Sequence, residues 1–176
     1  MDKIVYLVRH CQATGQEPNA ELTEEGKEQA KELMRFFEKR PVQHIISSPF
    51  TRAIQSIKPL ADSRGLQIEI DDRLFERRLL SESIKDWLER LEESFRDLEL
   101  KMAGGESSLE VTQLGMEVLE TAPDGTVIST HGNIIGLLLK RIDGLVGFKE
   151  WEELSHPDVY EVKVKKGDYV ARRIWS

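Results

Sequence analysis

The order of apolar and polar residues along the chain predicts short buried strands that alternate with amphipathic helices. The apolar run Val5–Val8 is too short for a helix, and polar side chains follow it directly, which is typical of a buried strand. Similar short runs predict strands over 44–48, 67–70 and 127–130. Apolar residues at helical spacing predict a helix that follows Thr23, its expected N-cap, and continues through Phe37.

The remaining segments add further helices and a hairpin. Residues 49–64 have a helical pattern, although Pro59 is expected to kink or shorten that helix. A strongly charged amphipathic helix is expected over 82–100, and after a loop at 101–108 a second helix continues through Leu119. Gly132 begins an apolar helix. Alternating residues at 159–164 and 169–175, on either side of Lys-Gly-Asp, predict a β-hairpin.

Strands that alternate with helices indicate an α/β fold. We expect a three-layer sandwich with a mainly parallel central sheet and helices on both faces. The helical pair over 82–120 interrupts the alternation, and we interpret it as a lid inserted over one face. A length of 176 residues suits a single domain over 1–176.

Composition and charge limit the possible partners. The net charge of −7 argues against a non-specific nucleic-acid binder. It does not argue against a phosphorylated substrate, because a few arginines in a cleft set the local field. Cys11 is the only cysteine, which excludes an internal disulfide and a multi-cysteine zinc site. Without a signal peptide or a long apolar span, we expect a cytoplasmic protein with no membrane partner.

Several chemically active side chains stand at strand ends. Arg9 and His10 follow the first strand, and His131 follows the strand over 127–130. Ser48 ends another strand, and Arg52 lies in the first turn of the next helix. In an open α/β sheet, ligands bind beyond the carboxyl ends of the strands. We therefore expect these two arginines and two histidines to meet at one edge.

Such a set suits a phosphoryl group. Arginine offers a fork of donors that matches phosphate oxygens, and a neutral imidazole is able to attack phosphorus. Several cations around a nucleophile stabilise phosphoryl transfer by position and charge, so we expect no metal or other cofactor. The leaving oxygen also needs an acid. Glu76, in the segment Arg73–Arg78, is the candidate.

The ordered motifs resemble the histidine phosphatase superfamily, the phosphoglycerate-mutase-like group. The resemblance rests on four motifs. The first combines Leu7–His10 with Leu22–Ala30, and the others are Ser47–Gln55, Gly104–Ser107 and Thr130–Gly132. It implies that His10 is the phosphorylated nucleophile and that Glu76 donates a proton and then activates water. It also implies that Arg9, Arg52 and His131 hold the phosphoryl group, with Thr14 as a further phosphate contact. The short form resembles the phosphatase branch.

The sequence departs from the family pattern after His10. The family usually has glycine where this chain has Cys11, and the following Gln12-Ala13-Thr14 is one residue longer. A cysteine side chain there requires a negative φ. We interpret Cys11 as a bystander whose thiol is open to oxidation, because nearby cations favour the thiolate.

The function expected from these observations is that of a metal-independent phosphomonoesterase, an acid-type phosphatase that acts on small phosphorylated substrates through a phosphohistidine on His10. A cysteine-dependent phosphatase fails on spacing, because Glu17 stands where that loop needs arginine. Two alternatives stay open: a phosphoglycerate mutase and a non-catalytic phosphate-binding or regulatory protein. We interpret His44 and His156 as structural or exposed. The oligomeric state is not indicated.

Overall fold

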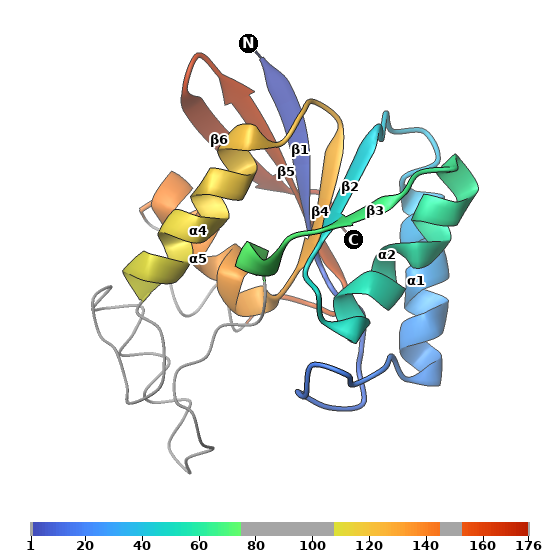
Figure 1. Cartoon of the computed structure of the whole chain (residues 1–176). Coiled ribbons are helices and arrows are strands. Elements are labelled where there is room, and N and C mark those ends of the chain that lie inside the picture. The colour runs from blue at the N-terminus through green and yellow to red at the C-terminus, as the bar shows by residue number, and fades with distance from the viewer. Residues whose placement is uncertain (1, 75–107, 145–152, 176) are drawn as a thin grey trace.

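The computed structural model describes residues 2–74, 108–144 and 153–175. Within these ranges the strands form one sheet in the order β3-β2-β4-β1-β5-β6 (Figure 1). Their bounds are Lys3–Arg9 for β1, His44–Ser47 for β2, Ile68–Ile70 for β3, Thr126–Thr130 for β4, Asp158–Lys165 for β5 and Asp168–Arg173 for β6. The strands predicted from the sequence, including the hairpin, are confirmed.

The register of the sheet aligns the carboxyl ends of three strands. β1, β2, β3 and β4 run parallel, whereas β5 pairs antiparallel with β1 and with β6. The sheet is therefore mainly parallel, as predicted. Arg9 of β1 pairs with Thr130 of β4, and Ser47 of β2 pairs with Ser129 of β4. Residues that follow these three strands consequently emerge at the same edge.

Helices cover both faces of the sheet, which confirms the three-layer sandwich. Helices α1 (Glu24–Phe36) and α2 (Thr51–Arg64) lie on one face, and α4 (Ser108–Thr121) and α5 (Gly132–Ile142) lie on the other (Figure 1). Successive residues of β1 point to opposite faces. Leu7 accordingly packs in the core cluster of α4 and α5, whereas Val8 packs in that of α1 and α2.

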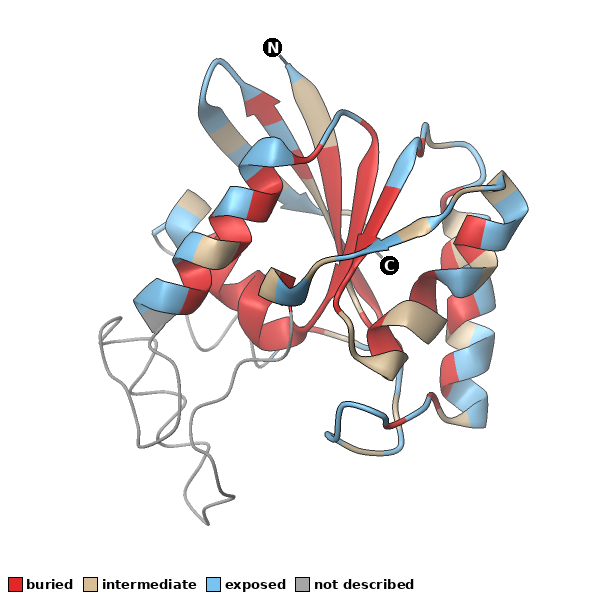
Figure 2. Ribbon diagram, in the orientation of Figure 1, coloured by how far each residue is buried: buried red, intermediate tan, exposed pale blue. Residues whose placement is uncertain are grey.

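Burial follows the same layers. Figure 2 shows buried residues along the central strands and on the sheet-facing sides of the helices. Every residue of β4 is buried, as expected for a strand with helices on both faces.

None of the helices in the described ranges combines the length and the apolar character needed to cross a membrane.

The predicted lid is not confirmed. The helix expected over 82–100 lies outside the described residues. The second half of the expected insertion is α4, whose Val118 and Leu119 are fully or almost fully buried in one core cluster with Ile135 and Leu138 of α5. Helix α4 therefore forms part of the layer that covers the sheet.

Pro59 does not shorten α2. The helix continues for five residues beyond the proline to Arg64 and ends at Gly65, whose φ of +64° is a left-handed C-cap. Leu60 and Ala61, directly after the proline, are buried beneath the sheet-facing side of the helix. Their burial offsets the backbone hydrogen bond that proline cannot make.

The start of α1 is attached to the chain just beyond β1. The Thr23 side chain caps the helix by accepting a hydrogen bond from Gly26 N at 3.0 Å, which confirms the predicted N-cap. The backbone N–H of Thr23 donates to the carbonyl oxygen of Gln12 at 3.1 Å. That carbonyl also lies against Gly26, where an added Cβ would be 2.1 Å from the oxygen. Glycine is thus required in the first turn by close backbone approach.

We predict that Gly26→Ala destabilises the protein. Helix propensity alone would predict a gain of up to about 1 kcal/mol, but the new methyl would overlap the Gln12 carbonyl. Overpacking of this kind costs about 1–3 kcal/mol, to be measured as the free energy of unfolding in urea. Gly144→Ala is the matched control, because its Cβ would meet nothing within 4 Å. Equal stability of the two variants would contradict the prediction.

Candidate active site

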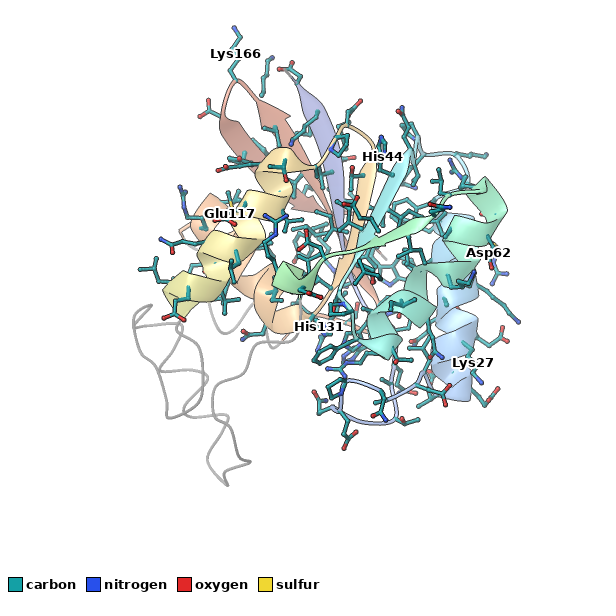
Figure 3. The ribbon with its side chains drawn as sticks, in the orientation of Figure 1. Lys27, His44, Asp62, Glu117, His131 and Lys166 are labelled. Carbon is teal, nitrogen blue, oxygen red and sulfur yellow. The ribbon has the colours of Figure 1, made fainter. Side chains whose placement is uncertain are left out.

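Four side chains predicted from the sequence meet at the carboxyl edge of the sheet: those of Arg9, His10, Arg52 and His131. His10 and His131 follow the paired strands β1 and β4, and their ring centroids are 5.3 Å apart. Arg52 reaches the same place from the first turn of α2 and is completely buried. Figure 3 shows His131 at this edge, with His44 at the opposite end of the strands. The expected convergence is therefore present.

The ring of His10 is held by both of its nitrogens. Nδ1 lies 2.7 Å from the carbonyl oxygen of Cys11, which only accepts, so Nδ1 carries the proton. Nε2 accepts a hydrogen bond from Arg52 Nε at 3.3 Å and therefore carries the lone pair. Burial above all, helped by the nearby positive charge of Arg52, lowers the pKa of His10 to about 3. His10 is a neutral imidazole with its lone pair directed into the site.

Arg52 is oriented by the loop that follows β1. Its Nη1 donates to the carbonyl oxygens of Gln16 at 3.1 Å and Glu17 at 3.0 Å. The same loop is tied to the start of α2, because Thr51 N donates to the carbonyl oxygen of Pro18. Backbone carbonyls thus hold a fully buried guanidinium in place and direct its Nε to His10.

Arg9 approaches the site from the end of β1. Its Nη1 donates to the carbonyl oxygen of Leu154 at 2.7 Å. The guanidinium lies against Gly132, the first residue of α5, where an added Cβ would come within 2.8 Å of Arg9 Nε. The glycine after His131 therefore leaves space for this arginine.

His131 is the most deeply buried imidazole of the site. Its Nε2 shares a hydrogen bond with Ser48 Oγ at 2.8 Å, and the Phe50 ring packs against it with a centroid distance of 5.0 Å. Burial, followed by the neighbouring His10 and the two guanidinium groups, lowers the pKa of His131 well below its usual value. Ser48, whose position at a strand end was evident from the sequence, positions this ring.

The sequence interpretation missed the contribution of His156. Its ring lies 5.5 Å from that of His10, centroid to centroid, with 35° between the planes. His156 is exposed, as expected, but its position beside His10 was not predicted. Its position depends on the pairing of β5, the first strand of the predicted hairpin, with β1. In that pairing Asp158 lies opposite Arg9. Residues just before β5 therefore reach the carboxyl end of β1.

The surroundings of Cys11 differ from those expected for a thiol that is open to oxidation. The negative φ is confirmed, since Cys11 is not among the residues with positive φ. Its side chain is fully buried in the core cluster of α1 and α2, and burial raises the pKa of its thiol to about 12. The predicted sensitivity to oxidation through a thiolate is therefore wrong. Desolvation of the thiolate is the largest cause, and the charge of Glu32 adds to it, whereas the hydrogen bond with Ser56 opposes them only in part.

Of the other two predicted site residues, Thr14 is not brought into this group, and Glu76 falls outside the part of the chain that the structure describes. Thr14 is exposed, and its backbone N–H donates to the carbonyl oxygen of Glu21 at 2.9 Å. The described chain approaches Glu76 at Leu74, whose carbonyl oxygen accepts a hydrogen bond from Thr130 Oγ1 at 3.0 Å. The roles expected for Thr14 and Glu76 stay predictions.

The arrangement combines a neutral imidazole with fixed positive charge. The lone pair of His10 Nε2 faces the guanidinium of Arg52, and Arg9 contributes the second permanent cation at this edge. Guanidinium groups bind the oxygens of phosphate and carboxylate, so the site is suited to an anion with an electrophilic centre. Within the described ranges, no group of three or more His, Cys, Asp or Glu is placed to hold a metal ion.

Comparison with known proteins gives consistent matches. The model of the histidine phosphatase superfamily (branch 1) matches residues 5–174. The probable phosphoglycerate mutase GpmB of Erwinia tasmaniensis is 30% identical over 162 residues, which cover 80% of this chain and 75% of that protein.

Solved structures share the fold. A mycobacterial glucosyl-3-phosphoglycerate phosphatase superposes with a TM-score of 0.77 at 22% identity and 99% coverage of both chains. Bacillus stearothermophilus YhfR gives a TM-score of 0.78 at 19% identity, covering 97% of this chain and 96% of that one. Together with the family match over nearly the whole sequence, these likenesses show that the chain belongs to the histidine phosphatase superfamily, branch 1.

Proposed function

We propose that this protein is a metal-independent phosphomonoesterase that hydrolyses small phosphorylated substrates through a phosphohistidine on His10. The observation that carries the proposal is the state of His10, a buried neutral imidazole whose Nε2 lone pair is unprotonated and faces Arg52. Since the pKa of His10 is lowered to about 3, the nucleophile stays neutral in mildly acidic solution. This property supports an acid-type phosphatase.

In the first step His10 Nε2 attacks phosphorus, and the bond from phosphorus to the ester oxygen breaks. In the free site Arg52 Nε donates to Nε2, so a phosphoryl oxygen has to replace that nitrogen as the acceptor. Arg9 and His131 complete the set of groups proposed to hold the equatorial oxygens. The leaving oxygen takes a proton from the acid proposed at Glu76.

In the second step water attacks phosphorus and gives a proton to the carboxylate proposed at Glu76, and the bond to Nε2 breaks to release phosphate and neutral His10. Fixed cations stabilise the charge of both transition states without reorganisation. The hydrogen bond from Nδ1 to the Cys11 carbonyl helps in both directions. It stabilises the positive charge that the ring acquires on phosphorylation and keeps the ring in place when phosphate leaves.

The names of the relatives include both reactions that this chemistry allows. The mycobacterial relative is a phosphatase that has been solved with inorganic phosphate, whereas the Erwinia relative is a probable phosphoglycerate mutase. A mutase would return the phosphoryl group from His10 to a sugar acid instead of water. We propose hydrolysis by a single domain in the cytoplasm, and neither nucleic acid nor membrane is a proposed partner of this acidic chain.

The decisive test is hydrolysis of para-nitrophenyl phosphate between pH 5 and 8 in the presence of a metal chelator. We expect His10→Ala to lower kcat by at least about 1000-fold, because it removes the nucleophile. Acid quenching should trap phosphate on His10 in the wild type, as detected by mass spectrometry. His44→Ala, at the opposite end of the sheet, is the matched control.

Other outcomes separate the alternatives. Full activity of His10→Ala would contradict the proposed mechanism. Transfer between phosphoglycerates that needs a bisphosphate primer, with little release of phosphate, would establish the mutase. Phosphate binding without turnover would establish the non-catalytic protein.

We predict that His10 stays neutral down to pH 5. The pKa of His10 is lowered from 6.5 to about 3, whereas an unperturbed imidazole would be only about 3% neutral at pH 5. The Cε1–H resonance should therefore stay constant from pH 8 to 5 in the folded protein and titrate near pH 6.5 in urea. A folded-state titration near 6.5 would contradict the prediction.

The same shift makes stability depend on pH. Below pH 6.5 the unfolded chain binds a proton on His10 that the folded chain does not bind until about pH 3. The free energy of unfolding should therefore fall on acidification below 6.5, by up to about 1.4 kcal/mol per pH unit for this group. His10→Asn should reduce that slope.

We predict that Gly132→Ala impairs catalysis more than stability. The added methyl would lie 2.8 Å from Arg9 Nε and would displace the guanidinium. A displacement of about 1 Å at a phosphoryl-binding group lowers kcat/KM by about 10–100-fold, while the end of a long side chain adapts at little cost to folding. Kinetics and urea unfolding measure both effects, with Gly144→Ala as the control. Unchanged kcat/KM would show that Arg9 is not needed in its present position.

A further inference from the structure

A third histidine lies beside the candidate nucleophile. The rings of His156 and His10 are 5.5 Å apart and inclined by 35°, a separation at which both rings border the same small volume. His10 and His131 are buried, whereas His156 retains an exposed surface. Among the described residues, His156 is thus the exposed imidazole beside His10.

Two charged groups and one neutral imidazole lie around His156. Its neighbours are Arg9 at the end of β1, His10 after β1 and Arg52 of α2. Partial burial, followed by the charges of Arg9 and Arg52, lowers the pKa of His156 to about 4. In the ligand-free site His156 is thus neutral at pH 7. A bound phosphate dianion would balance the two guanidinium charges and would itself favour the protonated ring, so it would raise the pKa of His156 against the effect of burial.

The adjacent carboxylate is already engaged. Asp158 is 1% exposed, and its Oδ1 accepts from Arg173 Nε at 2.9 Å and from Val159 N at 2.9 Å. Its Oδ2 accepts from Ser155 N at 3.0 Å. These bonds fix the backbone on both sides of His156 and commit the Asp158 charge to Arg173. Asp158 is therefore already paired, and a bound phosphoryl group would bring a further negative charge close to His156.

We propose that His156 is a further phosphoryl-binding residue of the active site. When a phosphate monoester or inorganic phosphate occupies the space beside His10, His156 takes up one proton from solvent. The resulting imidazolium donates an N–H to a phosphoryl oxygen, and the proton returns to solvent when phosphate leaves. His156 forms no bond to phosphorus. This inference rests on the proposed function, because it needs a phosphoryl group at His10.

The proposal distinguishes His156 from His131, although both side chains are imidazoles. His131 is fully buried and shares a hydrogen bond with Ser48, so its ring is fixed before a ligand arrives. None of the hydrogen bonds found among the described residues uses a ring nitrogen of His156. The ring is therefore free to turn a donor towards an incoming oxygen.

The test is binding of inorganic phosphate by calorimetry at pH 6 to 8, in buffers of different ionisation enthalpy. We expect His156→Gln to weaken phosphate binding about tenfold at pH 6.5, since a charge-assisted hydrogen bond becomes a neutral one. Proton uptake on binding should be smaller by up to one proton than in the wild type. His156→Asn should behave in the same way, and His44→Gln, an exposed histidine far from the site, should match the wild type.

The outcomes separate this inference from the proposed function. Hydrolysis that depends on His10, with phosphate affinity and proton uptake unchanged in both His156 variants, would overturn the role of His156 alone. A lower kcat with unchanged affinity and proton uptake would also overturn it, because it would show that His156 only positions the His10 ring. Absence of both phosphate binding and hydrolysis in the wild type would overturn the proposed function itself.

Discussion

The hydrogen bond from the buried Arg52 guanidinium to His10 Nε2 is the constraint on which the site depends. Arginine keeps its charge in proteins, so a protonated His10 would place two cations in contact where water does not screen them. Burial is the main cause that keeps the imidazole neutral, and the Arg52 charge adds to it. The Cys11 carbonyl then determines which nitrogen carries the proton. The buried site thereby holds an imidazole whose Nε2 lone pair is available without an adjacent base.

This arrangement lowers the stability of the protein when no ligand is bound. Two guanidinium groups and several imidazoles are gathered at one edge, and burial of like charge disfavours folding unless polar groups compensate. Backbone carbonyls of Gln16, Glu17 and Leu154 supply that compensation. They come from loops rather than from the sheet, so the segments that connect the elements are what hold the cations. An anion that binds among them relieves the repulsion, which couples ligand binding to stability.

The sequence was sufficient for the parts of the site that depend on strand ends. Arg9, His10 and His131 follow apolar runs that had to be neighbouring strands, and their convergence follows from the topology alone. His156 could not be found in this way, because its position depends on the antiparallel pairing of β5 with β1. The state of Cys11 was equally hidden, since charges are evident in the sequence but the depth of burial is not. The lid expected over 82–120 is not confirmed: an interruption of the strand–helix alternation suggests an insertion, but in the described part of that segment α4 packs against α5 in the layer that covers the sheet.

The two types of strand pairing give the site two different sides. The parallel strands β1, β2 and β4 are followed by His10, Ser48 and His131, which are all buried. Burial fixes the two imidazole rings and their protonation states before any ligand binds. The antiparallel strand β5 brings a histidine to the same nucleophile from a segment that retains an exposed surface. The buried groups that follow the parallel strands are suited to stabilising a transition state, because they need no reorganisation when it forms. His156, which we propose to respond to the charge of the ligand, would add a responsive group to these fixed ones around the same imidazole.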